Sequence, residues 1–540
     1  MKGAFRQSMT WLHTWAGLVF CWILYFMFVT GTVGYGDSEL DRWMKPEQPA
    51  PQRIGMGDAV TMAAAFLERE APGADRWFIT PSSDRNEPFL RVFWQYPQPA
   101  EGEEPVEPED LRGSAEIDAT TGDRMVEGRD TGGGQVLYRM HYILHYIDRD
   151  IAYRFIGVVT MLMFVGIISG IVVHKKIFKD FFTFRPSKGQ RSWLDMHNLM
   201  SVSSLPFQLM ITYSGLIFMV TTWMPGIALG SYGFDIKRAQ DELSSIAGIV
   251  EFERSGNTAQ LTALAPILVD AAERWGDDAV RNIEIRYPGD EASQVTINRR
   301  EGIERSAAGL IYSGTTGEFM KERPPIPSAS ASVALTMLGL HEGLFAGPVL
   351  RWLYIFSGVL GTAMVATGAI YWTAKRKKTD GQPQGRGYRF VEALNVGTIM
   401  GLPTAIAAYF IANRLLPVEM ASRADWEVHI MFLVWGALLL HPVLRPIQAA
   451  WREQAWLAAV AFAAVPLVNA ATTSLHLVNT VSSGDWSLAA IDLSCIALAV
   501  SFAVVAAVLG KSPAETKVDA KAPIVDALDS AVNDETPVAA

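Results

Sequence analysis

The chain has 540 residues, half of them hydrophobic, with 46 basic and 56 acidic side chains and a net charge of −10. This composition is too apolar for an ordinary soluble enzyme, and the chain is too long for one small domain. It therefore indicates a polytopic membrane protein. The cysteines, Cys21 and Cys495, both lie in apolar stretches, which excludes a disulfide framework and a Cys-x-x-Cys-His site for covalently attached haem.

Eight apolar stretches are long enough to cross a bilayer, which takes about 20 residues. They span 10–34, 152–174, 194–224, 349–373, 390–412, 427–445, 455–478 and 487–509. Lys2 and Arg6 precede the first stretch, as in a signal peptide. No small-x-small cleavage site follows it, so we expect a retained first helix.

Basic residues concentrate in two of the loops between these stretches. Loop 175–192 has six basic residues against one acidic residue, and loop 374–389 has the same balance. The positive-inside rule makes both loops and both chain termini cytoplasmic. The polar segments 36–150 and 226–345 are then expected on the other side, which in a bacterium is the periplasm.

These two polar segments each have the size of a small α+β domain. In both, a predicted helix, 56–69 or 261–275, comes before several short predicted strands. The last strands end in similar turns, Thr120-Thr121-Gly122-Asp123 and Thr315-Thr316-Gly317-Glu318, where glycine supplies a positive φ. The order helix, domain, histidine, helix therefore occurs twice, and we predict an internal duplication within the first 378 residues.

The predicted domain organisation follows from these boundaries. It comprises transmembrane helix 1 (1–35), a first periplasmic domain (36–150), helix 2 (151–174), a basic loop (175–192), helix 3 (193–225), a second periplasmic domain (226–345), helix 4 with a basic end (346–378), an appended bundle of four membrane helices (379–510) and a disordered cytoplasmic tail (511–540).

Histidines recur at matching points of the two halves. His13 follows a Trp-Leu pair at the start of the first helix, and His197 lies in the related Trp-Leu-Asp-Met-His run of the third. A hydroxyl residue and a glycine follow late in each helix, as Thr30-Gly31 and Ser214-Gly215. A Leu-His pair, Leu144-His145 or Leu340-His341, precedes the second and fourth helices. Ionisable residues at membrane helix ends are functional candidates.

A b-type haem needs two imidazoles that face each other across the iron from different segments. A pseudo-twofold axis between the halves would bring His13 to His197 and His145 to His341. The sequence therefore predicts two haem b groups, one near each membrane face, with these histidines as iron ligands. A single interfacial histidine is more often an ordinary hydrogen-bonded residue, and it is the doubled pattern that favours ligation.

Other histidines leave alternatives open. His141 lies one helical turn before His145, so it could be a spare haem ligand, half of a metal-binding pair, or neither. His174, at the cytoplasmic end of the second helix, could replace one member of the cytoplasmic pair. His429 and His476 could form a third site within the appended bundle.

The chain resembles the PepSY-associated transmembrane family in the histidine, hydroxyl-glycine and Leu-His patterns given above. Residues 117–123 also resemble the end of a PepSY domain. The resemblance covers roughly residues 1–378. It implies an iron-regulated protein of the bacterial inner membrane, a haem-b ferric-siderophore reductase, with His13 and His197 as cytoplasmic-side ligands and His145 and His341 as periplasmic-side ligands. The appended bundle departs from the family's common four-helix form.

We therefore predict an electron-transfer protein that reduces Fe(III) bound to a siderophore. No nucleotide-binding motif occurs, so its electrons would come from a membrane quinol or a separate donor protein; no nucleic-acid partner is expected. Two alternatives remain. The periplasmic domains could bind a partner such as a peptidase without catalysis, or the chain could transport siderophore or iron, with Asp492 as the main charge in the extra helices.

Overall fold

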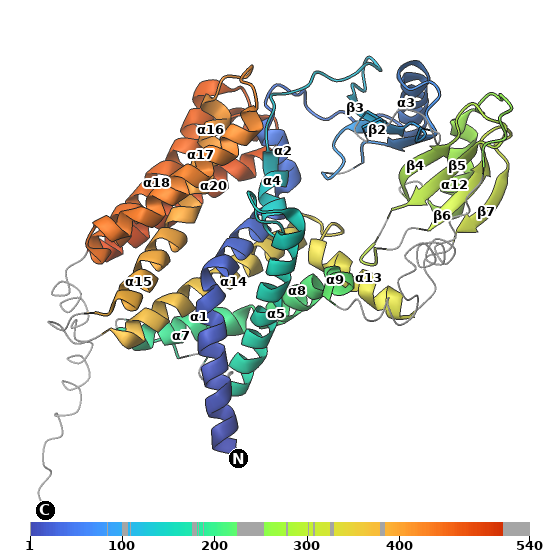
Figure 1. Cartoon of the computed structure of the whole chain (residues 1–540). Coiled ribbons are helices and arrows are strands. Elements are labelled where there is room, and N and C mark those ends of the chain that lie inside the picture. The colour runs from blue at the N-terminus through green and yellow to red at the C-terminus, as the bar shows by residue number, and fades with distance from the viewer. Residues whose placement is uncertain are drawn as a thin grey trace, which may run out of the picture.

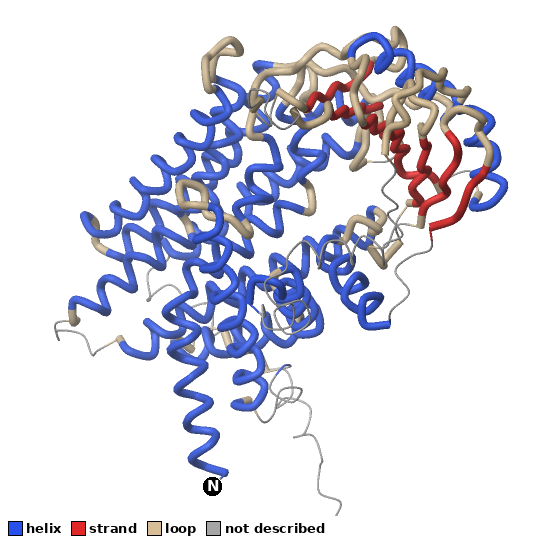
Figure 2. The backbone as a smooth tube through the Cα atoms, turned by 45° about the vertical axis from the view of Figure 1, so that its right-hand side comes forward, coloured by secondary structure: helices blue, strands red, loops and turns tan. Residues whose placement is uncertain are grey.

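The computed structural model has two parts, a body of long helices and a β-sheet region at one end of it (Figures 1 and 2). It describes residues 2–83, 85–99, 106–107, 110–174, 181, 183–186, 188–223, 253–276, 279–300, 302–305, 308–323, 329–377 and 384–510. The predicted disordered tail, 511–540, lies outside the described residues. We call the end of the body beside the sheet the sheet end and the opposite end the far end.

Seven helical segments in the described part of the chain are long and apolar enough to cross a membrane. They are α1 (Lys2–Gly34), α5 (Arg149–Val173), α14 (Pro348–Arg376), the consecutive helices α15 (Arg386–Ile399) and α16 (Gly401–Leu415), α17 (Arg423–Leu444), α18 (Ile447–Thr472) and α20 (Trp486–Gly510). The expectation of a polytopic helical membrane protein is thereby confirmed.

The third predicted span is not one helix, which corrects the prediction of eight continuous spans. It divides into α7 (Gln190–Ser203), α8 (Leu205–Phe218) and α9 (Val220–Trp223). Pro206 stands in the first turn of α8, where its missing N–H costs nothing, whereas inside a continuous helix it would remove a hydrogen bond and clash with the preceding turn. Hydropathy alone registers the apolar length and not this break.

The two polar segments contribute to a single seven-stranded sheet, a union that the sequence analysis did not predict. Its strand order is β3-β2-β1-β4-β5-β6-β7. β1 and β4 pair antiparallel in the middle, with Phe78 opposite Glu284. The strands are β1 (Arg76–Thr80), β2 (Leu90–Gln95), β3 (Arg112–Ile117), β4 (Val280–Arg286), β5 (Gln294–Arg299), β6 (Gly309–Ser313) and β7 (Phe319–Arg323).

One hydrophobic core joins the sheet to two helices, α3 (Met56–Glu70) and α12 (Leu264–Trp275). Alternate strand residues enter this core because side chains of a strand point to its two faces in turn. Trp77 and Ile79 of β1 and Ile283 and Ile285 of β4 are all buried there. The two segments therefore share their interior across the β1–β4 junction.

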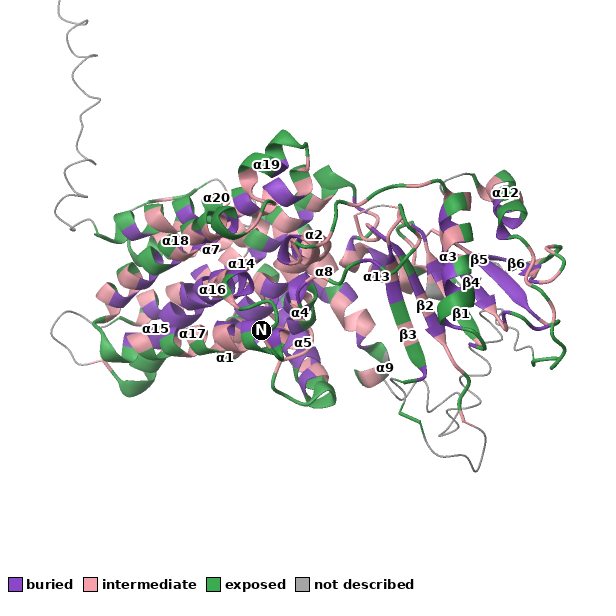
Figure 3. Ribbon diagram, turned by 90° about the horizontal axis from the view of Figure 1, so that it is seen from above, coloured by how far each residue is buried: buried purple, intermediate pink, exposed green. Residues whose placement is uncertain are grey.

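Short helices connect the sheet to the body: α2 (Asp37–Met44), α4 (Gly133–Met140) and α13 (Ala329–Glu342), while α19 (Leu477–Ser482) lies before α20. Buried residues gather inside the helical body as well as in the sheet (Figure 3). The appended bundle, α15–α20, contacts α1 directly. The Trp22 indole donates to the Asn395 side chain at 2.9 Å, and the Tyr25 hydroxyl donates to the Ile399 carbonyl at 2.9 Å.

Candidate functional site

Four histidines form two facing pairs within the helical body. His13 of α1 and His197 of α7 have ring centroids 6.3 Å apart and ring planes inclined at 59°. His141, directly after α4, and His341, in the last turn of α13, have centroids 6.0 Å apart and planes inclined at 43°. The first pair lies toward the far end and the second toward the sheet end.

The sheet-end pair corrects one expected partner, because His141 and not His145 faces His341. His145 instead stacks on Phe432 of α17, with ring centroids 5.9 Å apart. His341 belongs to a helix, whereas α4 ends at Met140 and the chain then runs through turns to α5. A Leu-His pair at the corresponding point of each half therefore does not give equal positions in space.

Each of the four rings lies against a glycine of a neighbouring helix. A Cβ atom added to any of these glycines would come within 2.6–3.2 Å of the facing imidazole, closer than ordinary carbon contacts of about 3.5–4.0 Å. The glycines are Gly170 for His13, Gly368 for His197, Gly31 for His141 and Gly215 for His341. Only residues without a side chain let the rings approach these helices so closely.

Each ring also has its Nδ1 atom hydrogen-bonded to the helix that carries its glycine. The acceptors are the carbonyl of Gly166 for His13 (2.9 Å), of Met364 for His197 (2.9 Å) and of Met27 for His141 (2.8 Å), and the hydroxyl of Ser214 for His341 (2.9 Å). A carbonyl oxygen only accepts, and the Ser214 hydroxyl already donates its proton to the Met210 carbonyl, so Nδ1 of each ring carries the proton. Nε2 then keeps its lone pair, the form in which histidine binds a metal.

A hydroxyl residue precedes every one of the four glycines. Its oxygen donates to a carbonyl of its own helix three or four residues earlier, as in Thr30 to Phe26 at 2.8 Å and Ser214 to Met210 at 2.7 Å. The sequence analysis recognised these two steps but missed Ser169-Gly170 and Thr367-Gly368 in α5 and α14. All four hydroxyl-glycine pairs, taken together, would have indicated four places where an imidazole ring can lie against a helix.

A cavity of about 660 Å³ surrounds the His13–His197 pair. Its volume falls within the range of about 300–1,000 Å³ that is typical of cofactor and ligand sites. His174 lines the same cavity, as do five basic residues, Arg6, Arg185, Arg191, Lys375 and Arg376. Trp372 Nε1 and Gln208 Oε1, both from residues of the cavity wall, are buried without a hydrogen-bond partner in the described part of the protein.

The histidines of the appended bundle, His429, His441 and His476, lie apart from the two pairs, and His441 Nε2 is 3.1 Å from a Glu453 carboxylate oxygen. The Tyr146 hydroxyl and His429 Nδ1 are 2.5 Å apart, and His476 stands at the N-terminus of α19. Within the described ranges, no group of three or more His, Cys, Asp or Glu side chains is arranged to hold a metal ion. Among the described residues, the histidine rings that face one another are those of the two pairs.

The fold defines the class of protein as a polytopic membrane protein with a sheet region at one end of its helices. Residues 10–375 match the family described as PepSY-associated TM region, and the chain therefore belongs to that family. The match contains all four paired histidines and ends within α14, so the bundle α15–α20 lies beyond it. A comparison with individually curated proteins finds no match.

Proposed function

We propose that the chain is a membrane oxidoreductase that carries electrons through two haem b groups and reduces Fe(III) held by a siderophore. The observation that carries this proposal is the pairing of four imidazoles, each with Nδ1 engaged and Nε2 left for a metal. His13 and His197 are the proposed ligands of one haem, and His141 and His341 of the other.

The spacing of the rings would let each pair of imidazoles hold one metal ion between them. Two metal–nitrogen bonds of about 2.0–2.1 Å, each extended by about 1.1 Å from the nitrogen to the ring centroid, separate the centroids by about 6.3 Å. The observed separations are 6.3 and 6.0 Å.

The cavity around the far-end pair has the composition that a haem requires. Apolar side chains and glycines line its interior, and basic residues such as Arg6, Arg191 and Lys375 lie in its wall, suited to the carboxylates of a porphyrin. The indole N–H of Trp372, which has no hydrogen-bond partner among the described residues, is a further donor for such a group. The chemistry that bound haem supplies is one-electron transfer, and its potential depends on its ligands and surroundings.

The proposed orientation of the chain in the membrane follows from the basic residues around the far-end pair, among them Arg185, Arg191 and Lys375, because basic residues favour the cytoplasmic side. The sheet and the His141–His341 pair are then on the periplasmic side of a bacterial inner membrane. Reduction there would release iron, because hard oxygen chelators hold Fe(II) much less tightly than Fe(III). The proposed electron donor is a membrane quinol or a separate protein.

Spectroscopy of the detergent-purified chain tests this function. We expect a Soret band and, after dithionite, the sharp α-band of low-spin haem, which a ferric siderophore then reoxidises under anaerobic conditions. A protein whose helices only anchor a partner-binding sheet would be colourless. If the protein contained haem that ferric siderophores failed to reoxidise, the proposal of electron transfer would stand, but ferric siderophore would be excluded as the substrate.

A further inference from the structure

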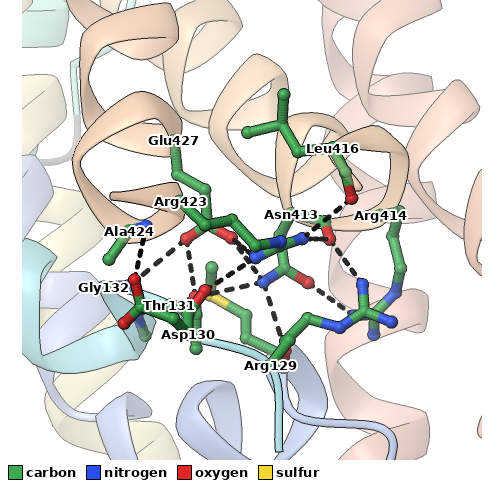
Figure 4. A network of polar contacts seen from close by, with 12 residues as sticks. Arg129, Asp130, Thr131, Gly132, Asn413, Arg414, Leu416, Arg423, Ala424 and Glu427 are labelled. Atoms are coloured by element: carbon green, nitrogen blue, oxygen red, sulfur yellow. Dashed lines mark hydrogen bonds and ion pairs between the residues drawn. The ribbon is translucent and has the colours of Figure 1, made fainter. Parts of the chain in front are cut away.

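A buried polar network joins the appended bundle to the connector between β3 and α4 (Figure 4). We call residues 129–133 the connector and the surrounding groups of α16 and α17 the clamp. The clamp residues are Tyr409 and Asn413 of α16 and Arg423 and Glu427 of α17. All four are buried.

Glu427 is the centre of the clamp. Its carboxylate accepts hydrogen bonds from the Thr131 hydroxyl at 2.6 Å and from the Gly132 backbone N–H at 3.2 Å. It also accepts from the Asn413 amide at 2.8 Å and pairs with the Arg423 guanidinium. The Arg423 and Glu427 side chains are fully buried, a state that charged groups reach only when they are paired and hydrogen-bonded.

Further bonds hold the connector backbone and side chains on both sides of Thr131. Arg423 donates to the Asp130 carbonyl at 2.9 Å, and the Asp130 carboxylate accepts from the first turn of α17 at 3.1 Å. Arg129 donates to the Asn413 carbonyl at 2.6 Å. Tyr409 donates its hydroxyl to the Gly133 carbonyl at 2.8 Å. The bundle therefore contacts every residue of the connector.

The glycine run Gly132-Gly133-Gly134 allows this close approach. Gly133 has φ of +61°, a conformation that residues with a Cβ rarely adopt. A Cβ on Gly132 would stand 2.7 Å from the Tyr409 hydroxyl. The connector backbone consequently lies directly on α16.

The connector leads without interruption into the helix that ends at His141. α4 begins at Gly133, and His141 follows its last residue, so the helix spans about 12 Å at 1.5 Å per residue. Its apolar side, including Leu137 and Met140, is buried. His341 is held differently, because α13 is tied to the sheet region by Arg305, which donates to Glu342 at 3.0 Å.

We infer that the appended bundle positions His141 by fixing the start of α4, and that the clamp residues are positioning residues for the His141–His341 pair. This gives α15–α20, which lie beyond the family match, a defined role in the site. The inference depends on the proposed function only for the identity of the group that His141 and His341 bind. The mechanical link between the bundle and His141 is separate from it.

Two conservative changes test the link in the full-length chain. Tyr409→Phe removes the hydroxyl that donates to the Gly133 carbonyl and leaves every charge in place. The control, Tyr388→Phe, removes a hydroxyl that donates to Glu392 at 2.9 Å from the same bundle on α15. Hydrogen–deuterium exchange of residues 133–141 is the readout, and it needs no haem.

We expect exchange of residues 133–141 to rise about fivefold in Tyr409→Phe, since the loss of one hydrogen bond shifts local opening by about that factor. The control should exchange there like the unaltered chain. In haem-containing protein, the midpoint potential of one haem should shift while the other keeps its value.

Unchanged exchange of residues 133–141 would overturn the inference. Equal acceleration in α14, far from the clamp, would also overturn it, because it would show a general loss of stability. A colourless protein with faster exchange confined to 133–141 would support the positioning role and defeat the proposed haem function, so the two failures are distinguishable.

Discussion

Replacing Gly31 with alanine should displace the His141 ring without unfolding the protein. The new Cβ would stand 2.6 Å from Nδ1 and 2.8 Å from Cε1 of His141. To reach a contact of about 3.4 Å or more, the ring must retreat by about 0.8 Å. That movement stretches the 2.8 Å bond between Nδ1 and the Met27 carbonyl to about 3.2 Å or beyond, where hydrogen bonds weaken.

The stability terms of Gly31→Ala nearly cancel. The weakened hydrogen bond costs about 1 kcal/mol, and the gain from replacing glycine inside a helix is about 0.5–1 kcal/mol. Gly436→Ala in the membrane helix α17 is the matched control, because nothing lies within 4 Å of its added Cβ and Gly436 does not line the cavity around the far-end pair. The control should gain the helix term alone.

Absorbance and low-temperature electron paramagnetic resonance of the two purified variants provide the assay. For Gly31→Ala we expect one of the two low-spin haem signals to shift or become high-spin, with a thermal midpoint close to that of the unaltered chain. For Gly436→Ala both signals should persist. If Gly31→Ala left both signals unchanged, the close contact of Gly31 with the His141 ring would have no effect on haem ligation, and the reasoning would be refuted.

Three further predictions follow from the site and the sheet. His141→Ala should remove one low-spin haem signal and His145→Ala should leave both, a difference visible in the reduced spectrum; the reverse result would restore the pairing expected from sequence. Phe78→Cys/Glu284→Cys should form a disulfide on oxidation, because directly opposed strand residues have Cβ atoms about 4.5–5.5 Å apart and these two are opposed, whereas a pair one position out of register should not. Burial alone would raise the pKa of Asp290, but hydrogen bonds from backbone N–H groups and a serine hydroxyl lower it to about 2. The pKa of the same group in an unfolded chain is about 3.9. The ionised Asp290 side chain therefore stabilises the fold fully above about pH 4, and this stabilisation is lost as the pH falls toward 2. Hydrogen exchange in β4 and β5 should therefore accelerate over that range, and Asp290→Asn should abolish this dependence.

Local patterns in the sequence predicted much of the fold. Apolar length and basic loops predicted the membrane helices, and matched spacing in the two halves predicted that His13 approaches His197, which the structure brings to 6.3 Å between ring centroids. The helix break before Pro206 was not predicted, because a hydropathy window sums side-chain hydrophobicity and ignores backbone hydrogen bonding. The partner of His341 was mistaken, because spacing cannot distinguish a helix from a run of turns.

Interactions between distant segments were beyond sequence reasoning. The β1–β4 pairing joins residues some two hundred positions apart, and each strand alone reads as an edge of its own small sheet. The clamp was missed for a related reason. Arg423 and Glu427 stand near the start of a span, where charges usually meet water or headgroups, and only the fold brings the connector over them.

The haem content of the purified full-length chain tests the central claim most directly. Pyridine haemochrome absorbance against protein concentration should give two haem b groups per chain, falling to about one in His13→Ala and about one in His141→Ala. Protein without haem, or haem content that survives replacement of His13, His141, His197 and His341 together, would contradict the account.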